Sequence, residues 1–102
     1  MSIEVTARHM DAGDAMQAYA KHKAEDLQAA FPEVEHVHVV MSKEKHRFQA
    51  DVFAQGKMHV RVDAKESADS MMAALDAAMD KVEKQLRRVW DKIQDHKHVS
   101  KP

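Results

Sequence analysis

The feature that most constrains the fold is a long amphipathic run from Ser67 to about His98. Its apolar residues recur every three or four positions, the spacing of one buried helical face. They are Met72, Leu75, Met79, Val82, Leu86, Val89, Trp90 and Ile93. We expect Ser67 to cap this helix, with Asp69 in its first turn. A helix with one apolar face must pack that face against another layer.

The polar side of the same helix divides into two parts. The first part, which we name the basic ridge, lies away from the apolar face at about 100° per residue, and it consists of Lys81, Lys84, Arg88 and Lys92. The second part, which we name the acidic flank, consists of Asp76, Asp80, Glu83 and Asp91, with Arg87 among them. A solvated face with i,i+4 ion pairs would account for Lys84 (with Asp80) and Arg87 (with Glu83). It leaves the ridge itself without acids, so a binding surface stays open as a second interpretation.

The rest of the chain alternates strand patterns with one more helical pattern. Apolar and polar residues alternate over residues 3–8, 36–41, 47–54 and 58–64, and a helical face runs from Asp14 to a stop at Pro32. Short polar links between the last three strands suit two consecutive hairpins. We therefore predict an α+β fold of β-α-β-β-β-α order. A four-stranded sheet would carry both helices on one face as a two-layer sandwich, with its first two strands parallel.

Length and composition limit the organisation and the class. The 102 residues suffice for one domain, predicted over residues 1–95, with a flexible tail over 96–102. The chain has no cysteine, no secretory signal pattern and no apolar run near the ~18 residues of a membrane span, which favours a cytoplasmic protein. A net charge of −1 argues against a generic nucleic-acid binder. Basic residues nevertheless concentrate in the middle and in the last helix, which suggests a polarised surface.

Catalytic chemistry finds little support in the residues. His36 and His38 share one strand face and His59 is expected near them, but no firm third metal ligand is identifiable. The chain has no cysteine nucleophile, and its two glycines exclude a Gly-rich phosphate loop. We therefore expect no enzyme activity, no catalytic residue, no metal and no cofactor.

The basic residues point instead to a polyanion. In the predicted layout the helices lie side by side, so the ridge and the Lys21–Lys23 cluster are expected to form one continuous patch. Lys and Arg without interleaved aromatic residues suit phosphate contacts, and folded RNA is read largely through shape and backbone. The alternative is a protein–protein module, such as a homodimer that packs its sheet face and leaves the ridge solvated.

Several segments resemble the ribosome hibernation-promoting factors, also called ribosome-associated inhibitors or sigma-54 modulation proteins. Residues 3–11 (IEVTARHMD) are similar to the family's opening, and residues 37–44 (VHVVMSKE) with 48–51 (FQAD) to its central hairpin. The most specific match is DSMMAALD at residues 69–76 with DKVEKQLRR at 80–88. Family members carry a closely similar Asp-x-Tyr-x-Ala-Ile-Asp … Asp-Lys-Leu-x-Arg-Gln-Leu run there. The resemblance covers almost the whole chain.

This resemblance implies a fold like that of double-stranded-RNA-binding domains and binding to the small ribosomal subunit through ribosomal RNA. The protein would occupy the channel of messenger and transfer RNA and inhibit translation during stress or stationary phase. The rRNA-contact role is carried onto the four ridge residues and onto Lys23, which matches a commonly basic position of the first helix. Lys21 and Arg87 complete the predicted RNA-binding set. The predicted set is therefore Lys81, Lys84, Arg88, Lys92, Lys23, Arg87 and Lys21.

Some positions depart from the family's pattern. Met71 stands where the family usually has Tyr, Asp26 where it often has Lys, and Trp90 where a polar residue is usual. The sequence shows neither the extension with which long members pair ribosomes nor the acidic tail of inhibitor-type short members. We therefore expect the resemblance to be greatest to the short hibernation-promoting type, which acts with a separate ribosome-dimerising modulation factor.

Overall fold

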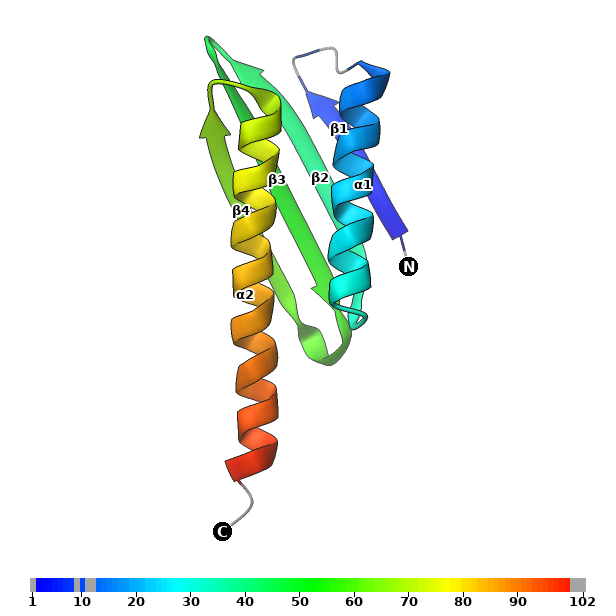
Figure 1. Cartoon of the computed structure of the whole chain (residues 1–102), viewed down its shortest axis with the longest axis vertical. Coiled ribbons are helices and arrows are strands. Elements are labelled where there is room, and N and C mark those ends of the chain that lie inside the picture. Colours follow the sequence, from blue (N-terminus) through cyan, green and yellow to red (C-terminus); the bar gives the residue numbers. More distant parts are fainter. Residues whose placement is uncertain (1, 9, 11–12, 100–102) are drawn as a thin grey trace.

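The computed structural model describes residues 2–8, 10 and 13–99, and side chains as far as Asp91. In chain order the elements are β1 (Ser2–Arg8), α1 (Asp14–Ala30), β2 (Val34–Glu44), β3 (Arg47–Gly56), the short 3-10 turn η1 (Lys57–His59), β4 (Arg61–Ala68) and α2 (Met71–Val99). Both helices lie on one face of the sheet (Figure 1). The predicted two-layer α+β fold of β-α-β-β-β-α order is confirmed.

The four strands form one sheet in the order β1-β2-β3-β4. The strand β1 runs parallel to β2, because α1 carries the chain back between them, and the two hairpins make the other pairs antiparallel. The register aligns Val5, Val39, Val52 and Ala64 across the sheet. One face of each strand is therefore apolar and covered by the helices, while the other face is open.

The core lies between this apolar sheet face and the two helices. Small side chains, among them Ala20, Ala24, Ala74 and Ala78, are fully buried on the helix faces, and they let the helix backbones come close to the sheet. Val39, Val52, Leu75 and Val82 are also fully buried and fill the space between the layers. Removing this much apolar surface from water holds both helices in place.

The start of α2 differs from the prediction. Ser67 is not the helix cap, because β4 continues to Ala68 through its pairing with β3. Ser70 caps the helix instead: its hydroxyl oxygen accepts a hydrogen bond from the backbone N–H of Ala73 at 3.2 Å. Asp69 precedes the helix, and its carboxylate pairs with Arg47 at 3.1 Å.

This later start also corrects the first turn of the apolar face. Met72 was expected to be buried but is 48% exposed, whereas its neighbour Met71 is 4% exposed and belongs to the core. From Leu75 to Leu86 the buried residues follow the predicted spacing, and Val89 packs against the core as a partly buried residue.

The link between β3 and β4 is longer than predicted. Met58 was expected to open the last strand, but it lies in η1 with φ 62° and is exposed, so β4 begins at Arg61. Gly56 ends β3 where the chain passes close to the backbone of Glu33, and a Cβ at this position would overlap the Glu33 carbonyl oxygen. The glycine is needed here for close approach rather than for an unusual φ.

The helix α2 continues beyond the end of the sheet (Figure 1). Its 29 residues span about 43 Å at ~1.5 Å per residue, against a longest molecular extent of 55 Å. The helix is assigned as far as Val99, and residues 100–102 lie outside the described residues. The predicted flexible tail over residues 96–102 therefore stays a prediction. None of the described helices is apolar enough over sufficient length to cross a bilayer.

Candidate nucleic-acid interface

The basic ridge lies on the side of α2 that faces the edge strand β4. Lys81, Lys84 and Arg88 are exposed there. Lys81 Nζ pairs with Glu66 Oε2 of β4 at 2.5 Å, and Gln85 Nε2 donates a hydrogen bond to the Asp63 carbonyl oxygen of β4 at 2.9 Å. These two contacts place the ridge along the outer edge of the molecule, away from α1. The side chain of Lys92 lies outside the described residues.

Ion pairs along α2 engage several predicted site residues. Lys84 pairs with Asp80 at 3.2 Å and Arg87 with Glu83 at 2.9 Å, which confirms both i,i+4 pairs expected from the sequence. Arg88 makes no ion pair with a described residue. Exposed pairs of this kind are worth about 0–1 kcal/mol, so a phosphate can replace the carboxylate at little cost.

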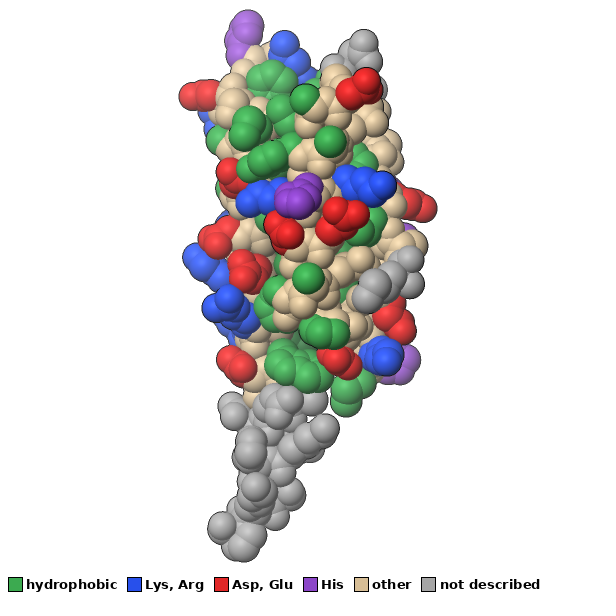
Figure 2. Space-filling model, turned by 45° about the vertical axis from the view of Figure 1, so that its right-hand side comes forward, with side chains coloured by type: hydrophobic (Ala, Val, Ile, Leu, Met, Phe, Trp, Pro, Cys, Tyr) green, Lys and Arg blue, Asp and Glu red, His purple; other side chains and the backbone are tan. Residues whose placement is uncertain are grey.

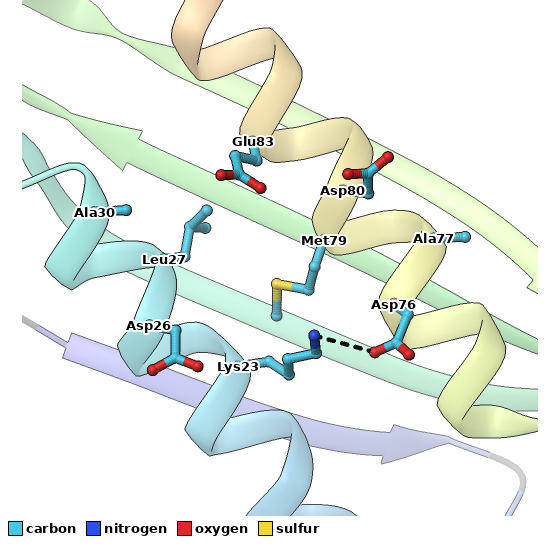
Figure 3. A pocket seen from close by; sticks show the side chains of 9 residues that line it. All are labelled: Lys23, Asp26, Leu27, Ala30, Asp76, Ala77, Met79, Asp80 and Glu83. Carbon is cyan, nitrogen blue, oxygen red and sulfur yellow. Dashed lines mark ion pairs between the residues drawn. The ribbon is translucent and has the colours of Figure 1, made fainter.

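The opposite side of α2 is a different environment. Between α1 and α2 lies a groove of about 700 Å³, lined by the carboxylates of Asp26, Asp76, Asp80 and Glu83 and by Lys23 (Figure 3). Both helices contribute acids to this groove. Asp76, Asp80 and Glu83 of the acidic flank thus face the groove beside α1, and an anionic ligand would be repelled from this position.

Lys23 is the basic residue of this groove, and it joins the two helices. Its Nζ lies 3.2 Å from the Asp76 carboxylate and 5.7 Å from the centre of the Tyr19 ring, and the Tyr19 hydroxyl donates a hydrogen bond to Asp76 at 2.5 Å. The Tyr19 bond, with the Lys23 bond and charge, lowers the pKa of Asp76 against the opposing effect of burial. Burial opposes the charged form of Lys23, but Asp76 outweighs it and raises the pKa of Lys23. The geometry gives Lys23 a structural role between the helices.

The prediction of one continuous basic patch across both helices is wrong. Lys21 is exposed on α1 and has no ion pair with a described residue, but the acidic groove separates α1 from the ridge on α2. Figure 2 shows acidic and basic side chains next to one another over the helical side of the molecule. The predicted site residues therefore fall into two groups, the ridge at the β4 edge and the Lys21–Lys23 cluster on α1.

The predicted site did not include several further cations, which lie on the edge strand β4 and in the hairpin turns. Arg61 and Lys65 are exposed on β4, but they lie on the open face of the sheet, opposite the ridge, because the alternating Val62 and Ala64 are buried under α2; Lys57 is exposed in η1. Their strand pattern was visible in the sequence, but only the sheet order shows that β4 is the edge strand below α2. At the other hairpin, Lys43 lies over the Phe48 ring at 5.3 Å and Lys45 is exposed in the turn.

The histidines considered as metal ligands lie on or near the open sheet face. His36 Nδ1 contacts the Ser2 hydroxyl, and His38 Nε2 lies 3.0 Å from Thr6 Oγ1 and 3.8 Å from Glu4 Oε2. His59 lies in η1. Over residues 2–8, 10 and 13–91, no three His, Asp or Glu side chains form a group that could hold a metal ion.

The fold and surface together define a class: a small β-α-β-β-β-α domain with a charged helical edge. Residues 3–94 match the model of the family described as Sigma 54 modulation protein / S30EA ribosomal protein, and the chain belongs to this family.

Curated relatives and solved structures agree with this assignment. A ribosome hibernation promotion factor of Rhizobium meliloti is 30% identical over 97 residues, covering 94% of this chain, which spans about half (51%) of that protein. The ribosome hibernation promoting factor of Escherichia coli K12 is 26% identical, covering 94% of this chain and 100% of that protein.

The fold is shared with two solved structures. A ribosomal subunit interface protein from Coxiella burnetii matches with a TM-score of 0.81 at 22% identity, over 89% of this chain and 99% of that chain. The N-terminal domain of Thermus thermophilus Protein Y matches with a TM-score of 0.77 at 25% identity, over 87% and 99%.

Proposed function

We propose that this protein is a non-enzymatic ribosome hibernation factor of the cytoplasm. It binds the small ribosomal subunit in the channel of messenger and transfer RNA, through phosphates of the ribosomal RNA. In this position it inhibits translation during stress or stationary phase. The function needs no catalytic residue, metal or cofactor, and ribosome dimers would require a separate modulation factor.

The observation that carries this proposal is the basic ridge at the β4 edge. Lys81, Lys84 and Arg88 project from one line of a helix whose other face is buried in the core, so their charges can face a row of phosphates. Arg61 and Lys65 of the neighbouring β4 lie at the same edge but on the opposite face of the sheet, so they do not extend the ridge itself. Membership in the family, with relatives named ribosome hibernation promoting factors, supports the ribosome as the source of that RNA.

The ion pairs of these residues support a ranking of the proposed contacts. Arg88 is available without breaking an ion pair to a described residue, while Lys81 and Lys84 must exchange a carboxylate for a phosphate. Lys23 is held by Asp76 between the helices, and Arg87 pairs with Glu83, which lines the acidic groove on the other flank. We therefore propose the ridge as the main contact and the Lys21–Lys23 cluster as a secondary one.

The test is binding of purified protein to isolated small subunits across a salt series. A variant with Ala at Lys81, Lys84, Arg88 and Lys92 should bind much more weakly at low salt. By analogy with duplex binding, each lost phosphate contact removes about 0.9 from the slope of log affinity against log salt, so the slope should become shallower by roughly three to four.

The matched control is Arg87→Ala, on the same helix but on the other flank, which should change affinity and slope much less. Circular dichroism establishes that both variants are folded. A folded quadruple variant with the original affinity and slope would show that the ridge is only a solvated face. Salt-insensitive self-association through the sheet, without subunit binding, would favour the homodimer alternative.

A further inference from the structure

The open face of the sheet carries an aromatic ring that the core does not explain. Phe53 lies on β3, on the side opposite both helices, and is 38% exposed. The register pairs it with His38 on β2 and with Asp63 on β4. The Phe53 and His38 ring centroids are 6.3 Å apart, with an angle of 39° between the planes. Two adjacent rings on an uncovered sheet form a platform on which a flat ligand can stack.

A hollow lies beside these rings. It has a volume of about 430 Å³ and is lined mainly by His36, His38, Phe53, Gln55, Arg61 and Asp63. The register explains the grouping, because the row His36–Gln55–Arg61 is next to the row His38–Phe53–Asp63. This volume falls within the ~300–1,000 Å³ range of small-ligand sites. The polar groups at its rim can form hydrogen bonds with a ligand that stacks on the rings.

We propose that this hollow binds an unstacked nucleobase of single-stranded RNA. Phe53 and His38 would stack on the base, the Asp63 carboxylate would accept hydrogen bonds from its amino group, and Arg61 would contact an adjacent phosphate. Sequence-tolerant stacking on exposed aromatic rings of a sheet, with cations along the backbone path, is a general mode of single-strand recognition. The inference concerns base contacts on another face and goes beyond the proposed function of the ridge.

The distribution of charge favours the base inside the hollow and the phosphate at its β4 rim. Asp63 inside the hollow disfavours a phosphate there, whereas Arg61 is exposed at the β4 edge without an ion pair to a described residue. A carboxylate recognises bases that present amino donors, as cytosine does through N4 and adenine through N6. Uracil lacks an exocyclic amino group, so the site should prefer cytosine or adenine over uracil.

The position of the hollow connects it to the ridge. Asp63 lines the hollow with its side chain, and its carbonyl oxygen accepts the hydrogen bond from Gln85 of α2, next to the ridge. The two surfaces therefore meet at one edge strand, on opposite faces of the sheet. An RNA strand whose phosphates contact the ridge has only to cross β4 to place a base in the hollow.

A second copy of the chain fits this face less well. The open face also carries Glu4, Arg8, Asp51 and Lys65, and charged residues are depleted at the centres of protein interfaces. Burying these side chains against an identical face would remove their hydration, a cost that ion pairing repays only with excellent geometry.

The test uses the purified full chain and eight-nucleotide oligo(C) and oligo(U) RNA, without ribosomes. Phe53→Leu, which keeps apolar volume but removes the ring, should weaken oligo(C) binding at least fivefold, since base stacking is worth about 5- to 150-fold in affinity. Phe53→Tyr should bind within about twofold of the original protein. Met72→Ala, which removes an exposed apolar side chain on α2, is the matched control and should have no effect.

Two further variants test the roles within the hollow. Asp63→Asn should reduce the preference for oligo(C) over oligo(U), and Arg61→Gln should make the salt slope shallower by about 0.7, the contribution of one phosphate in a single strand. Lys45→Gln, at the far hairpin, is the charge control. Equal oligo(C) affinity of Phe53→Leu and the original protein would overturn the proposal, as would a monomer–dimer equilibrium that Phe53→Leu abolishes. The ridge variant should keep the base preference, so failure of either site is distinguishable from failure of the other.

Discussion

The two sides of α2 have opposite roles although they belong to one helix. Towards α1, Asp76 is held by Lys23 and Tyr19, and Asp80 and Glu83 line an acidic groove. Towards β4, Lys81, Gln85 and Arg88 lie along an exposed edge. The first side ties the helices together through charge, and the second presents charge to solvent.

This difference shows that the neighbouring element, rather than the helix sequence, decides what a charged residue does. Lys23 and Lys81 are both lysines with a carboxylate partner on another element. Lys23 lies between two helices and its side chain is 34% exposed, whereas Lys81 lies at an edge and is 59% exposed; their partners Asp76 and Glu66 are 50% and 24% exposed. Lys81 is therefore the more accessible cation for a phosphate, whereas releasing Lys23 would remove a contact between the two helices.

The largest effect should come from breaking the apolar face that separates the two sides. Leu86 is 3% exposed, so Leu86→Ala should lower the free energy of unfolding by about 2–5 kcal/mol, measured by urea denaturation. Met72→Ala, at 48% exposure, should cost about 0.5 kcal/mol or less. Equal losses for the two variants would mean that the first turn of α2 is wrongly oriented.

A smaller effect should come from the side facing α1. Asp76→Asn should lower the free energy of unfolding by about 1 kcal/mol at pH 7, since it weakens the bonds to Tyr19 and Lys23. Affinity for small subunits should stay unchanged. Asp26→Asn, which lines the same groove and pairs only loosely with His22 at 3.9 Å, is the control and should cost less.

The pH dependence of the stability loss in Asp76→Asn tests whether that loss is electrostatic in origin. The pKa of Asp76 is lowered, so its contribution is present above the unfolded value near ~3.9 and is lost as the pH falls through the folded pKa. The pKa of Lys23 is raised, so its contribution is present below ~10.4 and is lost as the pH rises through the folded pKa. The stability gap between Asp76→Asn and the original protein should therefore shrink at both ends of the pH range. A gap that does not change with pH would indicate a packing defect.

The smallest expected effect is a change in affinity for small subunits when one acid on either side of α2 is neutralised. Asp80→Asn frees Lys84 of the ridge, and affinity for small subunits should rise about two- to fivefold, because an exposed pair worth up to ~1 kcal/mol no longer has to be broken. Glu83→Gln frees Arg87 on the other side and should leave the affinity within about twofold. Equal gains in binding assays at low salt would mean that both sides of α2 contact the RNA.

The fold was predictable because its signals are local. Alternation in the strands and the three-to-four spacing from Leu75 onward each depend on neighbours a few residues away. The errors arose where long-range pairing decides. Ser67 has the chemistry of a cap, but pairing with Gln49 keeps it in β4. The cap is Ser70, three residues later, and the helix starts at Met71, which is turned inward.

In the candidate site, too, the local contacts were predictable from the sequence and the long-range contacts were not. The i,i+4 pairs of Lys84 and Arg87 followed from spacing, whereas the partners of Lys23 and Lys81 come from distant segments that no helical projection contains. The acidic groove has the same cause, because it needs Asp26 of α1 opposite Asp80 and Glu83 of α2. The hollow around Phe53 depends on three strands in register. The role of the ridge in RNA binding stays a prediction.

The hydrogen bond from Gln85 to the Asp63 carbonyl oxygen has a consequence for how partners can attach. Edge strands attract other chains because their backbone groups can extend the sheet by strand addition. In the middle of β4 one backbone acceptor is already occupied by a side chain, and Arg61, Asp63 and Lys65 place charges along the same strand. An incoming strand would meet an interrupted ladder and a charged border. This edge therefore resists aggregation, and recognition there falls to side chains rather than to the backbone.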